Sequence, residues 1–168
     1  MPALPSVAEV LAPNDWSGPI DDHITLDYDG RHRRRIVLTA DHGAQFLLDL
    51  PQSRLLPGGA GLKLDDGRLI EVIARAEPLL EVRASGEVAL LRLAWHIGNR
   101  HLAAQIEPGR ILIRQDHVIA TMLQGLGAIV SGIEAPFDPE GGAYGDAPAG
   151  HDHAGHGHHH GSSGGHEH

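Results

Sequence analysis

The chain has 168 residues, enough for one ordinary domain or two small ones, and its 41% hydrophobic but only 4% aromatic content predicts a core of Leu, Ile, Val and Ala. The absence of cysteine excludes disulfides, thiolate catalysis and Cys-based zinc or iron–sulfur sites, and the two methionines disfavour a soft copper(I) carrier. The formal net charge of −9 argues against nucleic acid or an anionic membrane as a partner.

Short strands are predicted between residues 20 and 75, where apolar and polar residues alternate or form short apolar runs. In GLKLDDGRLIEVIAR, two apolar runs flank Asp65-Asp66-Gly67, which suits a tight hairpin turn, and Pro57-Gly58-Gly59 marks another turn. The basic cluster Arg31–Arg35 is either a docking patch or the start of a strand, and we favour the strand start. We expect residues 1–77 to form a small all-β domain.

The pattern changes after Glu77-Pro78. A strand precedes a predicted helix from about Gly86 to Asn99, with Ser85 as its N-cap and Gly98 or Asn99 as a left-handed terminating residue. Two strands around Pro108-Gly109, a helix capped by Asp116 and a last strand complete the order β-α-β-β-α-β. This order predicts a ferredoxin-like domain over residues 78–137, with one antiparallel sheet and both helices on one face, and thus an α+β chain.

Residues 138–168 show no apolar periodicity, and eight of the last 18 residues are His. We expect a disordered His-rich tail, which could be a metal-binding segment, a purification tag or a low-complexity extension. The longest His run is three residues, His158 to His160, and this interruption favours a native segment over a tag. The N-terminal residues lack the features of a signal peptide and no apolar stretch is long enough to span a membrane, so we expect a cytoplasmic protein.

Six histidines lie outside the tail, and three of them fall within 22 residues: His96, His101 and His117. Neutral imidazoles are good ligands for Ni, Zn, Cu or Co and need no thiol partner. Spacing alone leaves two interpretations open, a metal site or ordinary half-buried histidines. The sequence contains no H-E-x-x-H motif, nucleophile elbow or phosphate-binding loop, so we expect no enzymatic activity.

Four features in order are more specific than the His count: HIGNRHLAAQI, RQDHVIATMLQGLGA, EAPFDPEGGAYG and the His-rich end. Together they resemble the urease accessory nickel carriers of the UreE family. The resemblance covers residues 78–168, whereas the N-terminal half matches in length and β character.

This resemblance implies a head-to-head homodimer in which His101 of each subunit meets at the two-fold axis and shares one Ni²⁺. It also implies further ligands from the tail, here His151 and His153, and a peripheral metal-binding role for His117. Gln115 departs from relatives that have an imidazole there, which puts a second body site in doubt. Ala104 stands where the family often has Pro, and we expect only a local backbone effect.

The function that the resemblance implies is that of a nickel metallochaperone, with Zn²⁺ or Cu²⁺ as other ions that could bind. Its implied partners are the urease maturation GTPase and the urease apoprotein with its accessory complex, and the β domain would contact protein partners. The alternative is a passive Ni or Zn buffer that acts through the His tail alone.

Overall fold

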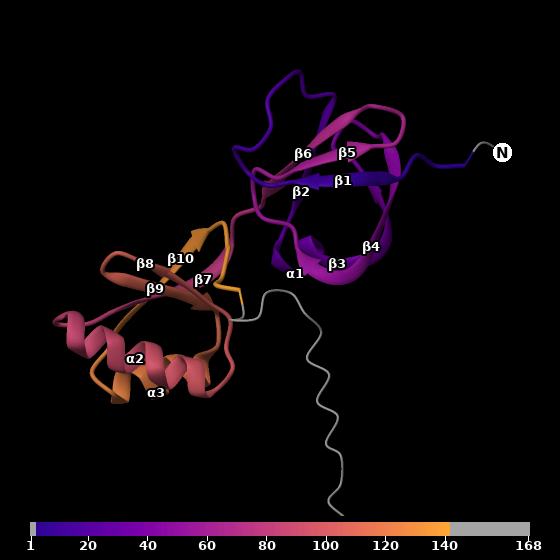
Figure 1. Cartoon of the computed structure of the whole chain (residues 1–168). Coiled ribbons are helices and arrows are strands. Elements are labelled where there is room, and N and C mark those ends of the chain that lie inside the picture. Colours follow the sequence, from indigo (N-terminus) through magenta and orange to yellow (C-terminus); the bar gives the residue numbers. More distant parts are fainter. Residues whose placement is uncertain (1–2, 142–168) are drawn as a thin grey trace, which may run out of the picture.

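The computed structural model describes residues 3–141, which form two domains joined between residues 74 and 77 (Figure 1). The N-terminal domain contains β1 (Val7–Leu11), β2 (Asp22–Leu26), α1 (Tyr28–Arg31), β3 (His32–Thr39), β4 (Gln45–Leu55), β5 (Gly61–Leu64) and β6 (Leu69–Ala74). Four strands form a sheet in the order β1-β5-β6-β2, and β3 and β4 form a two-stranded ribbon. Both predicted turns are present, with Gly59 and Gly67 at φ angles of 85° and 91° that suit glycine.

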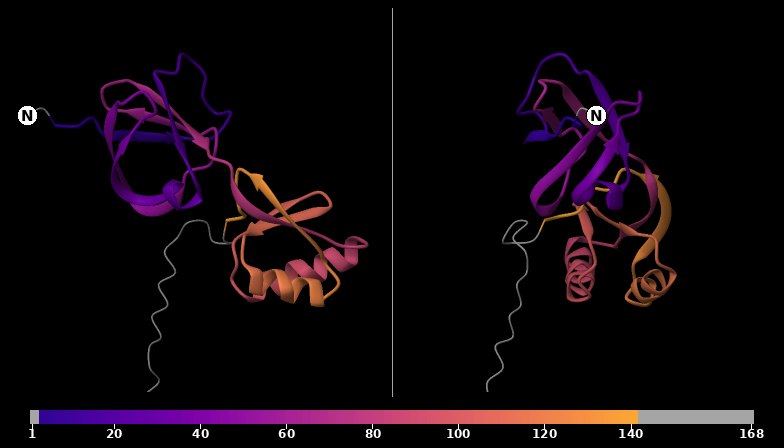
Figure 2. Two further views of the ribbon diagram at one scale, coloured as in Figure 1. Left: turned by 180° about the vertical axis from the view of Figure 1, so that it is seen from behind. Right: turned by 90° about the vertical axis from the view of Figure 1, so that its right-hand side faces the viewer.

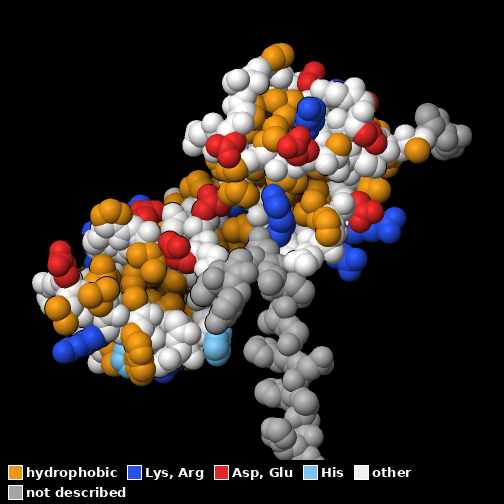
Figure 3. All heavy atoms as spheres, in the orientation of Figure 1, with side chains coloured by type: hydrophobic (Ala, Val, Ile, Leu, Met, Phe, Trp, Pro, Cys, Tyr) orange, Lys and Arg blue, Asp and Glu red, His pale blue; other side chains and the backbone are white. Residues whose placement is uncertain are grey.

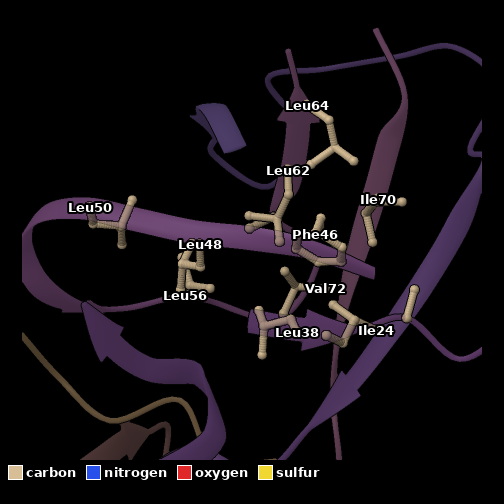
Figure 4. Close-up of a cluster of buried hydrophobic side chains, with 12 residues drawn as sticks. Ile24, Leu38, Phe46, Leu48, Leu50, Leu56, Leu62, Leu64, Ile70 and Val72 are labelled. Atoms are coloured by element: carbon tan, nitrogen blue, oxygen red, sulfur yellow. The ribbon is translucent and has the colours of Figure 1, made fainter. Parts of the chain in front are cut away.

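Alternating side chains of the sheet and the ribbon meet in the core of this domain (Figure 4). Phe46, Leu48, Leu62 and Ile70 are completely buried there. The close-up shows the side chains of β4 pointing toward those of β5 and β6, so the two layers share one core.

The short helix α1 is the one helical element among the described residues of the N-terminal domain and was not expected from the strand pattern. Asp27 caps it, since the side-chain Oδ1 accepts a hydrogen bond from the N–H of Gly30 at 2.7 Å. Arg31 is the last residue of α1, and β3 begins at His32, which bears out a strand start within the basic cluster. Unlike its neighbours in the cluster, Arg31 is completely buried.

The C-terminal domain contains β7 (Glu77–Arg83), α2 (Glu87–Asn99), β8 (Ala104–Glu107), β9 (Arg110–Arg114), α3 (His117–Gly125) and β10 (Ile129–Ala135). Its sheet has the order β10-β7-β9-β8, and every adjacent pair is antiparallel. Both helices cover the face that points away from the N-terminal domain (Figures 1 and 2). The predicted α+β class with a ferredoxin-like domain is therefore confirmed. Within residues 3–141, no helix is long and apolar enough to cross a membrane.

The helix ends confirm one predicted cap and correct two other assignments. Asp116 caps α3 as predicted, because its Oδ1 accepts from the N–H groups of Val118 and Ile119 at 2.8 and 3.0 Å. Ser85 does not cap α2, since the helix starts one residue later with Gly86 at the N-cap and no side-chain bond. The left-handed residue after α2 is neither Gly98 nor Asn99 but His101, at a φ of 56°.

Candidate metal centre

His101 lies in the turn that follows α2. Its positive φ is uncommon for a residue with a side chain, although His adopts this region more readily than most. The N–H of His101 donates to the carbonyl of Gly98 at 3.0 Å, and the N–H of Arg100 donates to that of Ile97 at 3.2 Å. These short-range bonds tighten the helix end and hold His101 in an exposed position, where a metal ion can reach it.

A hollow of about 350 Å³ lies beside His101, and both domains line it. Tyr28 of α1 forms one wall, and Arg114 and Asp116 form another. The Arg114 guanidinium bonds to Asp29, with Nη2 at 2.9 Å from Oδ2, and lies 5.5 Å from the centre of the Tyr28 ring. Because this cation is paired with a carboxylate, it repels a divalent ion near His101 less than a free guanidinium would.

His117 is the first residue of α3 and is exposed. Its neighbour Asp116 uses one carboxylate oxygen to cap the helix, and Gln115 lines the same hollow as His101. The structure therefore places His117 at the edge of this region, as an exposed imidazole that does not line the hollow although Asp116 and Ile119 do.

Residues 3–141, which we call the body of the chain, do not supply a complete set of metal ligands by themselves. Within residues 3–141, no group of three or more His, Cys, Asp or Glu side chains is close enough together to hold a metal ion. His96 lies on α2 with its ring edge-on to Trp95, at a centroid distance of 5.1 Å. The predicted ligands His151 and His153 lie outside the described residues. A metal bound at His101 would thus need donors from the tail or from a second copy of the chain.

A second apolar stripe on α2 escaped the sequence analysis. Leu93 and Ile97 of α2 are buried in the core, but Val88, Leu91 and Trp95 project from the helix and are 64%, 68% and 64% exposed. Hydrophobic side chains accordingly gather on the surface of the C-terminal domain (Figure 3). The spacing i, i+3, i+7 was visible in the sequence and is the signal that could have identified this stripe.

Two histidines of the N-terminal domain, His23 and His42, contact carboxylates away from His101. The Nδ1 atom of His42 lies 2.7 Å from Oδ1 of the buried Asp22, and His23 Nε2 lies 3.2 Å from a Glu71 oxygen. The hydrogen bond between the side chains raises the pKa of His42 and lowers the pKa of Asp22. This pair fixes the turn between β3 and β4.

The junction between the domains was also missed by the sequence analysis. Phe137 is completely buried and its ring lies 5.4 Å from that of Tyr28, while the buried Arg31 donates to the Phe137 carbonyl and to Asp138. These partners are separated by more than 100 residues, so no local pattern could indicate them.

The fold and the site define a two-domain protein in which a β domain is joined to a ferredoxin-like domain that presents an exposed histidine. Family models match both parts: the UreE urease accessory protein N-terminal domain over residues 7–75 and the corresponding C-terminal domain over residues 77–168. The chain belongs to the UreE family of urease accessory proteins.

Several similar proteins carry the description urease accessory protein UreE. The protein from Chelativorans sp. (strain BNC1) is 60% identical over 140 residues, which are 83% of this chain and 86% of the relative. That from Rhodobacter capsulatus is 52% identical over 154 residues, or 91% of this chain and 96% of the relative. The one from Bradyrhizobium sp. (strain ORS 278) is 57% identical over 135 residues, or 80% of this chain and 64% of the relative.

Proposed function

We propose that this protein is a nickel metallochaperone, which binds Ni²⁺ and delivers it to apo-urease during assembly of the urease active site. The observation that carries the proposal is the setting of His101 in a member of the UreE family. His101 is exposed beside a hollow, and residues 3–141 do not offer around it the further donors that a stable resident metal would need. Such an incomplete site suits an ion that must be released again.

The second ligand is His101 of another copy of the chain. In a two-fold symmetric dimer each subunit contributes the same residue, so two His101 imidazoles can share one Ni²⁺ at the axis. The apolar stripe of α2 supports dimerisation through the C-terminal domains, because Val88, Leu91 and Trp95 lie on the helix that leads to His101. Packing this stripe against the same stripe of a second subunit removes apolar surface from water.

Further ligands come from His151 and His153. Glu140 is hydrogen-bonded to Ala104, three residues from His101, and ten residues separate Glu140 from His151. Such a segment spans at most about 40 Å, so the tail histidines can reach a metal at His101 of either subunit. His117 has a peripheral role, since Gln115 cannot replace a second imidazole at its side.

Imidazole ligands suit collection followed by release, because they bind less tightly than a set of thiolates and can exchange one at a time. Protons compete for the same nitrogens, so Ni²⁺ binding should weaken as the pH falls through the histidine range. Zn²⁺ can use the same ligands, and Cu²⁺ should bind more tightly than either ion. The receiving partners are the urease maturation GTPase and the urease apoprotein with its accessory complex.

The test is a calorimetric titration with Ni²⁺ at neutral pH on three proteins: the full chain, the chain ending at Tyr144, and the shortened chain with His101→Ala. We expect shortening to remove the weaker sites and leave about one Ni²⁺ per dimer. His101→Ala should then abolish that remaining site. His23→Ala in the shortened chain is the matched control and should bind like its parent, because His23 pairs with Glu71 in the other domain.

The passive buffer is the alternative that the same titration can detect. If shortening removes all Ni²⁺ binding and His101→Ala changes nothing, then the body holds no metal and the tail alone stores it.

A further inference from the structure

The chain that follows β10 crosses the C-terminal sheet. We call residues 136–140 the strap. β10 and β8 are the two edges of the sheet, with β7 and β9 between them, so the edges are three strand spacings or about 14 Å apart. The strap leaves β10 at one edge, and at its far end the N–H of Glu140 donates to the Ala104 carbonyl of β8 at 2.8 Å. In Figure 1 the orange segment after β10 accordingly runs between the two domains.

The strap is fixed to the sheet along its length. The Phe137 side chain packs on Leu79 of β7 and Leu112 of β9, and all three are 0–1% exposed. One residue later the Asp138 N–H donates to the side-chain oxygen of Gln105, on β8, at 2.8 Å. These contacts follow the strand order across the face that α2 and α3 leave uncovered.

Arg31 fastens the strap from the N-terminal domain. Its Nη1 donates to Oδ1 of Asp138 at 2.5 Å and to the Leu56 carbonyl at 3.2 Å, and its Nη2 donates to the Phe137 carbonyl. A buried guanidinium is costly unless it is paired and hydrogen-bonded, and two of its three partners belong to the strap. Most hydrogen bonds of the Arg31 guanidinium are therefore made to the strap.

We propose that Arg31 is a positioning residue for the tail: it holds the strap across the sheet so that the His-rich segment starts beside His101 instead of at the β10 edge. This inference rests on the proposed function. With the strap in place, ten residues lie between the last anchored residue, Glu140, and His151; without it, 15 residues lie between Ala135 and His151. For a chain with coil statistics, the longer tether and the 14 Å displacement lower the effective concentration of His151 at His101 roughly threefold.

The position of the strap can be measured directly because the chain has no cysteine. Spin labels would be placed at Gly141→Cys, where an added Cβ meets nothing within 4 Å, and at Gln124→Cys, which is exposed on α3. Labelled full-length chain diluted with unlabelled chain would report only distances within one chain. We expect a narrow distance distribution for the parent and a broad one for Arg31→Met.

Arg35→Met is the matched control, since Arg35 belongs to the same basic cluster but its side chain is 70% exposed and pairs with Asp49 at the surface. It should leave the distribution narrow. Phe137→Ala removes the side-chain packing of the strap but keeps Arg31, and it should also broaden the distribution. This second variant keeps the test decisive if Arg31→Met does not fold. A distribution that stays narrow in every folded strap variant would overturn the proposal.

A second readout separates this inference from the proposed function. In the full chain, Arg31→Met should weaken the tail-dependent part of Ni²⁺ affinity roughly threefold. The chain ending at Tyr144, with or without Arg31→Met, should bind Ni²⁺ equally. If His101→Ala leaves Ni²⁺ binding unchanged, the proposed function fails, while the spin-label distances still decide whether Arg31 holds the strap. If Arg31→Met changes the distances but leaves the full chain's affinity unchanged, the strap is structural only and the positioning role is wrong.

Discussion

The two faces of the C-terminal sheet are covered in different ways. On one face, Leu80, Val82, Ile111 and Ile113 pack against α2 and α3, which the same stretch of sequence supplies. On the other face, the apolar residues include Leu79 and Leu112, and they are covered by Phe137 of the strap together with Tyr28 of the N-terminal domain. Successive residues of one strand thus serve two separate cores.

The difference shows how the domains are joined. The helix-covered face is complete within residues 80–130. The other face, which we call the open face, needs a residue from position 28 and another from position 137. The part of the open face that these residues do not cover is polar. There Glu81 accepts hydrogen bonds from Arg83 at 2.7 Å and from Arg110 at 2.7 Å. The small apolar area of this face can therefore be buried by another domain, while the charged area beside it stays in contact with water.

The largest expected effect is a loss of unfolding free energy when a buried residue on either face of the sheet is truncated. It tests whether both faces are tightly packed. Ile111 and Leu112 are neighbours on β9, each 1% exposed, and point to opposite faces. Replacing either with Ala should lower the free energy of unfolding by about 2–5 kcal/mol, because buried contacts are lost and a cavity forms. Chemical denaturation of both full-length variants measures this. A loss below about 1 kcal/mol for Leu112→Ala alone would mean that the open face is only loosely covered.

A smaller effect is expected at the helix starts, which belong to the helix-covered face. Asp116→Ala should destabilise the protein by about 1 kcal/mol, because two N–H groups of α3 lose their acceptor. Gly86→Ser at the start of α2 should instead be neutral or stabilise by a few tenths of a kcal/mol, since the extended backbone there already suits a capping side chain. Thermal unfolding of both variants compares the two helices, and equal destabilisation would contradict the assigned caps.

The smallest expected effect is on the pH dependence of stability, and it arises from Glu81 on the open face. Hydrogen bonds from Arg83 and then from Arg110 hold the pKa of Glu81 below its ordinary value. A carboxylate with a lowered pKa contributes stability above its unfolded pKa, and this contribution is lost as the pH falls through the folded pKa. Glu81→Gln should therefore lower the melting temperature at pH 7, and the difference should shrink toward pH 3.

The Asp116→Ala variant provides the contrast for this pH series. That substitution removes a helix cap and leaves Glu81 with both of its arginine partners. A Glu81→Gln effect that is the same at pH 3 and pH 7 would show that the carboxylate's charge does not support the open face.

The candidate site was predictable to the extent that it depends on local patterns. The histidines were visible in the sequence, the Asp116 cap follows from its place before an apolar helical run, and Gly59 and Gly67 mark turns that need a positive φ. The left-handed conformation of His101 was not predictable, because Gly98 and Asn99 are intrinsically better suited to it. The hydrogen bonds that tighten the last turn of α2 decide which residue takes that conformation.

By itself the sequence determined the order of the elements and the α+β class, since these follow from periodicity and turn residues over a few neighbouring positions. Only the tertiary structure decided that Arg31 is buried while the next three arginines are exposed, that Phe137 completes a core with Tyr28, and that the tail begins at the β8 edge. The physical reason is that burial and pairing depend on groups brought together across more than 100 residues. A basic cluster looks the same in sequence whether its side chains face solvent or another domain.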